Sequence, residues 1–234
     1  VLVPSLTFAA TATAVLRAGM VPVLGDVDHK NWLLTPTTAR AAATRHELAC
    51  IMPVAAFGCP HPVAAWDNFH RETGLPVVID AAGAFGNQQV GESAIVVFSF
   101  HATKAFGIGE GGLIAARDEQ FVATARKLTN FGIDISTGLV ARPGTNAKMS
   151  EYHAAVGLAT LARWPARAAR RRSLFADYSS RLRALCPAVM QQARPVNGIY
   201  SIMQVLLPDG ADRERVAALL ARDGVETRSW YLPL

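Results

Sequence analysis

The sequence predicts an α/β fold, a three-layer sandwich with a mainly parallel sheet, followed by part of a smaller α/β domain. Short apolar runs alternate with longer segments of helical periodicity up to about Met149. This rhythm is typical of βαβ units, whose parallel sheet is buried on both faces. Hydrophobic residues make up 51% of the chain and charged residues 18%, so there is ample material for a buried core.

Turn residues between these segments mark where each strand and helix of the sandwich begins and ends. We expect strands at residues 1–3, 21–24, 50–57, 77–79, 95–100 and 113–116. An Ala-rich helix is expected over residues 8–18, and Thr35 followed by Pro36 marks the start of a second helix. A third helix, over residues 62–73, is closed by Gly74, since glycine tolerates the left-handed backbone of a helix end.

The pattern changes after about residue 150. We expect helices at residues 150–161 and 166–185, then a strand, a helix and a strand at residues 199–207, 212–222 and 225–230. Residues 1–160 would form the large domain, and residues 161–234 a connecting helix and the start of a small domain. Because the first residue is Val1 rather than Met and the second domain is incomplete, we expect an internal piece of a longer protein.

Composition argues against several classes of protein. No apolar run approaches the roughly 20 residues that span a bilayer, so no membrane segment is expected. The three cysteines are scattered, which predicts reduced thiols in a cytoplasmic protein and neither a disulfide framework nor a metal site. The formal charge of +5 comes largely from one helical segment, where we expect a solvated face rather than a nucleic-acid site. Its arginines are Arg163, Arg167, Arg170, Arg171 and Arg172.

Asp80 lies in the first of two loops with unusual chemistry. The carboxylate directly follows the apolar strand residues 77–79, and functional groups collect at the carboxyl ends of parallel strands. A carboxylate in such an apolar setting needs a partner. The alternative is a helix N-cap, a position that Asp favours.

Lys104 lies in the second loop, after the strand at residues 95–100. A lysine at the apolar end of a sheet can have its pKa lowered by desolvation, which makes it nucleophilic and able to form a Schiff base. Ser99 and Thr103 offer hydroxyl donors suited to a phosphate. Taken by itself, a lysine such as Lys104 is more often an ordinary surface residue.

Together the two loops indicate a site for pyridoxal 5'-phosphate (PLP). This cofactor needs an acid at its ring nitrogen, a lysine on its aldehyde carbon and neutral donors around its phosphate. Asp80 and Lys104 follow successive strands, so both could reach one ring.

Several segments, in order along the chain, resemble the DegT/StrS family of fold-type-I, PLP-dependent aminotransferases, which mostly act on keto sugars attached to nucleotides. The segments are residues 3–11 (VPSLTFAAT), 79–82 (IDAA), 98–104 (FSFHATK), 109–112 (GEGG) and 146–151 (NAKMSE). The resemblance continues to residues 231–234, at the end of the sequence.

The resemblance implies a role for each matching residue. Lys104 would be the Schiff-base lysine and proton shuttle, Asp80 the partner of the pyridinium nitrogen, and Ser99 a ligand of the cofactor phosphate. Phe8 would stack on the ring face, and Asn146 would reach the phosphate in a partner subunit. The implied assembly is a homodimer with shared active sites, and the implied amino donor is glutamate.

The sequence departs from the family pattern at three points. Gly83 stands where the family usually has a polar residue, three positions after the acid. Ala147 replaces a residue that is commonly Tyr or another bulky group. The family's Ser-Gly-Thr phosphate-binding turn would lie upstream of Val1.

The lysine loop contains two further patterns. The glycines of residues 107–112 formally fit GxGxxG, but they lead into an expected strand rather than a helix, which argues against a dinucleotide site. We expect them to let the backbone turn closely around the loop. His101 and Glu110 could each contact cofactor or substrate, or be plain surface groups.

The resulting hypothesis is transfer of an amino group from an amino acid to a nucleotide-linked keto sugar. One rival is another PLP reaction such as sugar dehydration. In that branch of the family, the resemblance implies a His at the position of Lys104, so Lys104 favours transamination. A second rival is a non-catalytic or regulatory protein of the same fold. The loss of a polar residue at Gly83 favours this interpretation. A third, a basic nucleic-acid binder, predicts salt-dependent retention on DNA, and we expect none.

Overall fold

The strands that carry Asp80 and Ser99 lie in a mainly parallel sheet. A computed structural model describes residues 1–231 of the chain. It contains a parallel pair, β1 (Leu2–Pro4) and β2 (Val23–Gly25), and a group of three, β3 (Val78–Asp80), β4 (Ile95–Ser99) and β5 (Gly112–Ala115). β3 and β4 are parallel, and β5 runs antiparallel to β4.

Residues 51–54 join the two groups of strands. Ile51 forms parallel bridges to Leu2 on one side and to Val77 on the other, and Val54 bridges to Asp80. The order across the sheet is therefore β2, β1, residues 51–54, β3, β4 and β5. The strand expected at residues 50–57 is present only as this bridging segment, because the chain turns into the short 3₁₀ helix Ala56–Gly58.

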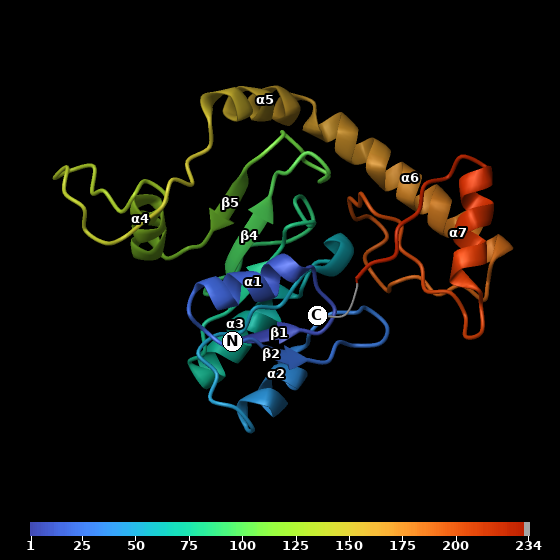
Figure 1. The fold of residues 1–234 in the computed structure, drawn as a ribbon, viewed down its shortest axis with the longest axis horizontal. Coiled ribbons are helices and arrows are strands. Elements are labelled where there is room, and N and C mark those ends of the chain that lie inside the picture. The colour runs from blue at the N-terminus through green and yellow to red at the C-terminus, as the bar shows by residue number, and fades with distance from the viewer. Residues whose placement is uncertain (232–234) are drawn as a thin grey trace.

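Helices cover the two faces of the sheet, as the alternation of side chains along a strand requires. On one face, Ala39 of α2 (Pro36–Ala43) and Trp66 of α3 (Val63–Thr73) pack in a core that includes Leu2, Ile79 and Val96. On the other face, α1 (Ala9–Arg17) inserts Val15 between Val1 and Val3. Figure 1 shows these three helices around β1 and β2. The predicted α/β class and mainly parallel sheet are confirmed.

The start of α2 and the end of α3 have the capping interactions that the sequence predicts. The hydroxyl of Thr35 accepts a hydrogen bond from the backbone N–H of Thr38, and Pro36 occupies the first helical position of α2. Gly74 ends α3 with φ of 73°, a left-handed conformation that glycine adopts without strain. These local signals were strong enough to place both ends correctly.

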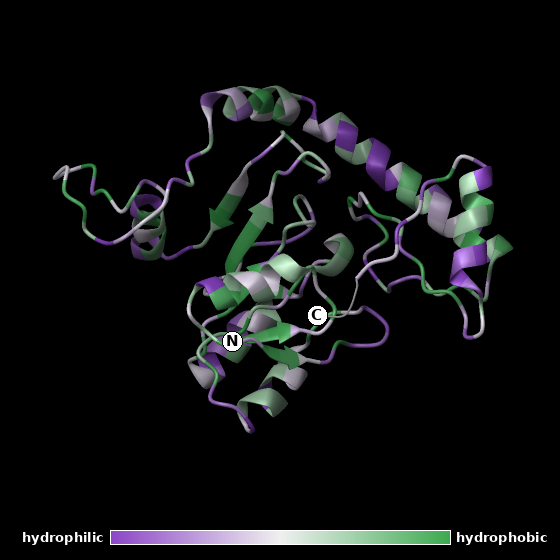
Figure 2. Cartoon of the chain, viewed as in Figure 1, coloured by the Kyte–Doolittle hydropathy of each residue, from purple (hydrophilic) through white to green (hydrophobic). Residues whose placement is uncertain are grey.

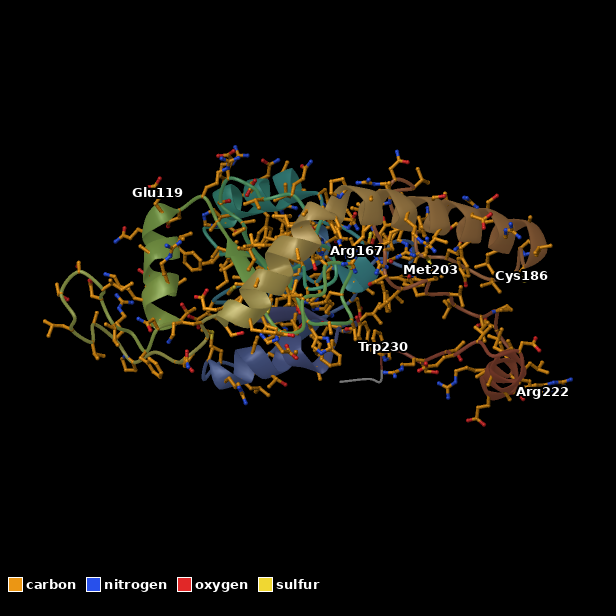
Figure 3. The ribbon with its side chains drawn as sticks, turned by 90° about the horizontal axis from the view of Figure 1, so that it is seen from above. Glu119, Arg167, Cys186, Met203, Arg222 and Trp230 are labelled. Carbon is orange, nitrogen blue, oxygen red and sulfur yellow. The ribbon has the colours of Figure 1, made fainter. Side chains whose placement is uncertain are left out.

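A helical arm crosses above the sheet. It consists of α5 (Glu151–Ala162) and α6 (Trp164–Leu185), and it leads toward α7 (Arg213–Arg222). Figure 2 shows hydrophobic β4 and β5, and hydrophilic residues along much of α6. In Figure 3, α4 (Glu119–Leu128) and α7 mark opposite ends of the molecule. The sequence analysis missed α4, none of whose residues is buried.

The strands expected at residues 199–207 and 225–230 are wrong. Both segments are without strand structure, and the only pairing there is an isolated bridge between Met190 and Leu206. Ile199 and Tyr200 are buried, but Asn87 binds the backbone of Ile199, so this apolar stretch packs on the larger layer instead of pairing. A strand without a neighbour has no stable partner for its backbone groups. No helix among residues 1–231 is long and apolar enough to cross a membrane.

Candidate active site

Asp80 ends β3 with its backbone and its side chain both fixed. Its N–H donates to the Pro53 carbonyl at 2.9 Å, and its own carbonyl accepts from the N–H of Ala55 at 2.8 Å. In the side chain, Oδ2 accepts from the Thr11 hydroxyl at 2.7 Å, and Oδ1 accepts from the N–H of Ala82 at 3.1 Å. No helix follows Asp80, so the N-cap alternative is wrong.

Thr11 and Thr7 form a relay behind this carboxylate that the sequence analysis did not predict. Both side chains are buried, and their hydroxyl oxygens lie 2.8 Å apart. The single hydroxyl proton of Thr11 is used in the hydrogen bond to Asp80, so Thr7 must donate to the Thr11 oxygen. The only signal in the sequence is the spacing of four residues, which places Thr7 and Thr11 one helical turn apart at the start of α1.

Three aromatic rings contact one another in series, and the middle one, that of Tyr231, lies close enough to Asp80 to respond to its charge. Phe8, directly before α1, is 61% exposed, and its ring centroid lies 6.5 Å from that of Tyr231. Tyr231 in turn stacks on Phe57 at 5.3 Å with an interplanar angle of 20°. Burial, and then the negative charge of Asp80, raise the pKa of Tyr231 to about 12. Its hydroxyl is therefore protonated at neutral pH and can donate a hydrogen bond.

The lysine loop begins at Ser99, the last residue of β4, and closes on itself. The Ser99 hydroxyl accepts from the N–H of His101 at 3.2 Å, and the N–H of Lys104 donates to the His101 carbonyl at 2.9 Å. The N–H of Ala102 donates to the Gly109 carbonyl at 2.7 Å, which draws the two ends of the loop together. The side chain of Lys104 is half-buried.

A cluster of aromatic rings anchors the loop directly after Lys104. Phe106 is buried, and its ring lies 4.7 Å from that of Phe85, 5.2 Å from Phe100 and 5.3 Å from Trp164 at the start of α6. Packing of this kind fixes the backbone within two residues of Lys104. The loop is thus held by the core on one side while its polar residues face outward.

The glycines of this loop serve close backbone approach, as predicted. A side chain at Gly107 would place its Cβ 2.4 Å from the Ala102 carbonyl oxygen. Gly109 has φ of 104°, and a Cβ there would lie 2.7 Å from the ring of His153. The segment leads into β5 and not into a helix, so the argument against a dinucleotide site is confirmed.

His101 and Glu110 interact on the surface of the loop. His101 Nδ1 lies 2.9 Å from the Thr103 hydroxyl, and His101 Nε2 lies 3.6 Å from a carboxylate oxygen of Glu110. All three residues are exposed, and an exposed polar contact of this kind contributes little stability.

The register of the sheet brings Asp80 and Ser99 to one edge. Asp80 pairs with Val97 of the parallel neighbour, so Ser99 lies two residues further along the same edge. Asn146 is not brought there: it is exposed, and it pairs with Asn130 in an isolated bridge beyond α4. No hydrogen bond in residues 1–231 joins Asn146 to Asp80, Ser99 or Lys104. Its expected role in a partner subunit stays a prediction.

Two other expectations concern Gly83 and the arginine cluster. Gly83 packs against backbone: its carbonyl oxygen would lie 2.8 Å from a Cβ at Gly58. Arg171 and Arg172 donate to the carbonyls of Tyr200 and Asn197, at 3.4 and 2.9 Å, so part of the cluster holds the chain after α6. Among the described residues, no group of three His, Cys, Asp or Glu side chains could hold a metal ion.

The structure thus places an acid at the end of a central strand and a lysine in a closed loop after the next strand, the two residue types that PLP requires. The chain belongs to the DegT/DnrJ/EryC1/StrS aminotransferase family, which it matches over residues 1–234.

Individual proteins are similar over nearly the whole of this chain. Protein Rv3402c of Mycobacterium tuberculosis (strain H37Rv) is 32% identical over 99% of this chain and 58% of its own length. A structure from Bacillus cereus ATCC 10987, assigned as a PLP-dependent aminotransferase, is 32% identical with a TM-score of 0.87, over 97% of this chain and 64% of the other.

A third relative was solved with a sugar. DesI, in the presence of its TDP-sugar product, is 33% identical with a TM-score of 0.80, over 97% of this chain and 60% of its own. This chain thus spans about three fifths of the length of the relatives it matches.

Proposed function

We propose that the protein is a PLP-dependent aminotransferase that moves an amino group from an amino acid, glutamate, to a nucleotide-linked keto sugar. The observation that carries this proposal is Asp80, whose two carboxylate oxygens are fixed by Thr11 and Ala82 beside the loop that contains Lys104. DesI, solved with its TDP-sugar product, supports the sugar nucleotide as the class of substrate.

The side chains present suit PLP. Asp80 is an acceptor for a protonated ring nitrogen, because Thr11 and Ala82 orient both of its oxygens from within the protein. Lys104 would bind the aldehyde carbon covalently, and the Ser99 hydroxyl is a neutral donor for the phosphate at the same edge of the sheet. Phe8 offers an exposed aromatic face for the ring. Asn146 would serve the site of a partner subunit in a homodimer.

The chemistry then divides between two residues of this chain. Bound PLP supplies an electron sink that stabilises negative charge at the α-carbon of the amino donor. Asp80 would keep the ring nitrogen protonated, which would make the sink effective. The Lys104 amine would take the proton from the α-carbon of the amino donor and deliver it to the former aldehyde carbon of the cofactor. We place this reaction in the cytoplasm, in line with the three free cysteines.

The test uses the full-length protein purified with PLP. We expect a visible absorbance band that bleaches on addition of glutamate, and that borohydride fixes to the peptide containing Lys104. Lys104→Ala should abolish the covalent label, whereas Lys30→Ala, which removes an exposed lysine, should leave it intact. A folded full-length protein without any band would overturn the proposal and favour a non-catalytic member of the fold.

A further inference from the structure

Two aromatic residues beside the site have a strained backbone. Trp32 and Phe57 have φ of 59° and 55°, in the left-handed region that residues other than glycine rarely adopt. Their rings meet edge to face at 6.0 Å, and Phe57 also stacks on Tyr231. Strain of this kind persists only where the surroundings impose it, and it gathers at functional sites.

Residues 192–194, on the chain that follows α6, impose it. The side-chain amide of Gln192 donates to the carbonyls of Asn31 and Ala56, at 2.6 and 3.3 Å. These are the carbonyls directly before Trp32 and Phe57. The N–H of Ala193 donates to the Lys30 carbonyl at 2.8 Å. A segment distant in the sequence therefore holds the backbone at both left-handed residues.

Arg194 makes the contact to Phe57 itself. One guanidinium nitrogen donates to the Phe57 carbonyl at 3.2 Å, and another donates to the Ile202 carbonyl at 3.1 Å. The guanidinium carbon lies 3.8 Å from the ring centroid of Tyr200 and 4.4 Å from that of Phe175. Within residues 1–231, no carboxylate lies within salt-bridge distance of it.

This environment needs an arginine. A flat guanidinium can lie against aromatic rings while its edge donates to two carbonyls, and a lysine ammonium cannot do both. Burial lowers the pKa of Arg194 to about 10, so the group is still charged at neutral pH. A partly buried cation without an anionic partner is costly, and one of its two hydrogen bonds holds the Phe57 carbonyl.

We propose that Arg194 is a positioning residue of the active site: it fixes Phe57, and the Phe57 ring in turn places Tyr231 beside Asp80 and Phe8. This inference rests on the proposed function. Tyr231 then presents a protonated hydroxyl close to Asp80, where it can bind a substrate. No hydrogen bond within residues 1–231 joins Lys104 or Ser99 to Arg194, Phe57 or Tyr231. Arg194 therefore acts mainly on the binding of substrates and leaves the covalent attachment of the cofactor at Lys104 intact.

The experiment compares full-length variants loaded with PLP. Arg194→Met removes the donors but keeps apolar bulk, and Arg194→Lys keeps the charge. The matched control is Arg172→Met, because exposed Arg172 also donates to a backbone carbonyl of the same stretch, that of Asn197. We expect Arg194→Met to raise the KM for the keto sugar about tenfold or more, since small displacements at a site have large kinetic effects. The visible band and kcat should change less than about threefold.

A double mutant tests the route through Tyr231. If Arg194 acts by placing Tyr231, then Arg194→Met should add little to the KM effect of Tyr231→Ala, whereas independent effects would multiply. Arg194→Lys should fall between wild type and Arg194→Met, and it provides the comparison if the methionine variant does not fold. A KM no different from that of Arg172→Met, or full additivity with Tyr231→Ala, would overturn the inference while the band and activity remain. A wild-type protein without the band would instead end the proposed function, and this role of Arg194 with it.

Discussion

Replacing Thr11 by Val would test whether the support of Asp80 matters for the chemistry. Valine has nearly the shape of threonine but cannot donate the 2.7 Å hydrogen bond to Oδ2, so Ala82 alone would orient the carboxylate. A hydrogen bond to a charged acceptor contributes about 1.5–3 kcal/mol. With tenfold per about 1.4 kcal/mol, the upper bound of the effect on kcat/KM is a loss of roughly 10- to 100-fold.

Thr7→Val is the control for this prediction. It removes a hydrogen bond between two neutral hydroxyls from the same relay, for which about 0.5–1.5 kcal/mol, or about two- to tenfold, is the expected cost. The assay is the rate at which glutamate bleaches the visible band in a single turnover. Thr11→Ser should retain most of the rate. If Thr11→Val reacted within twofold of wild type, or lost less than Thr7→Val, Asp80 would not depend on the relay.

Two further predictions concern stability. Burial alone would raise the pKa of Asp67, but hydrogen bonds from the backbone of residues 92–94 and from the Ser93 hydroxyl lower it below its ordinary value. This stabilisation is therefore present above about pH 4 and is lost as the pH falls through the lowered pKa. Asp67→Asn should cost at least about 2 kcal/mol at pH 7, and urea unfolding should show the gap to wild type closing on acidification; an equal gap at pH 7 and pH 3 would contradict this reasoning. Gly109→Ala should lower Tm and activity, because its Cβ would displace the His153 ring in addition to the backbone strain. Gly138→Ala, at φ of 71° with open space around it, should carry the strain alone, about 1–2 kcal/mol, and an equal loss in both variants would contradict the contact with His153.

Local signals were sufficient where short-range chemistry decides the structure. The ends of α2 and α3 followed from Thr35, Pro36 and Gly74, and the sheet followed from apolar runs between turn residues. Asp80 and Lys104 were predicted to reach one ring because they follow successive strands, and the register places Asp80 and Ser99, where the lysine loop begins, at one edge of the sheet. That both side chains reach one ring stays a prediction. Such features depend on residues close together in the sequence or on the topology of βαβ units.

Features that depend on distant partners were not predictable in the same way. Apolar periodicity at residues 199–207 looks the same whether the segment pairs in a sheet or packs on another layer, and here it packs. The support of Asp80 by Thr11 joins residues 69 positions apart, and the contact of Arg194 with Phe57 joins residues 137 apart. No periodicity or motif encodes either contact.

The two key residues of the site are held very differently. Asp80 belongs to a strand paired on both sides, through Val54 and through Val97, so it cannot shift without opening the sheet. Lys104 belongs to a loop whose bends depend on glycines and whose polar residues face solvent. The acid is thus held within the sheet, whereas the lysine lies in a loop that the rings around Phe106 anchor on one side and that is open to solvent on the other. Substitution of the polar residues of the loop should therefore leave the position of Asp80 unchanged.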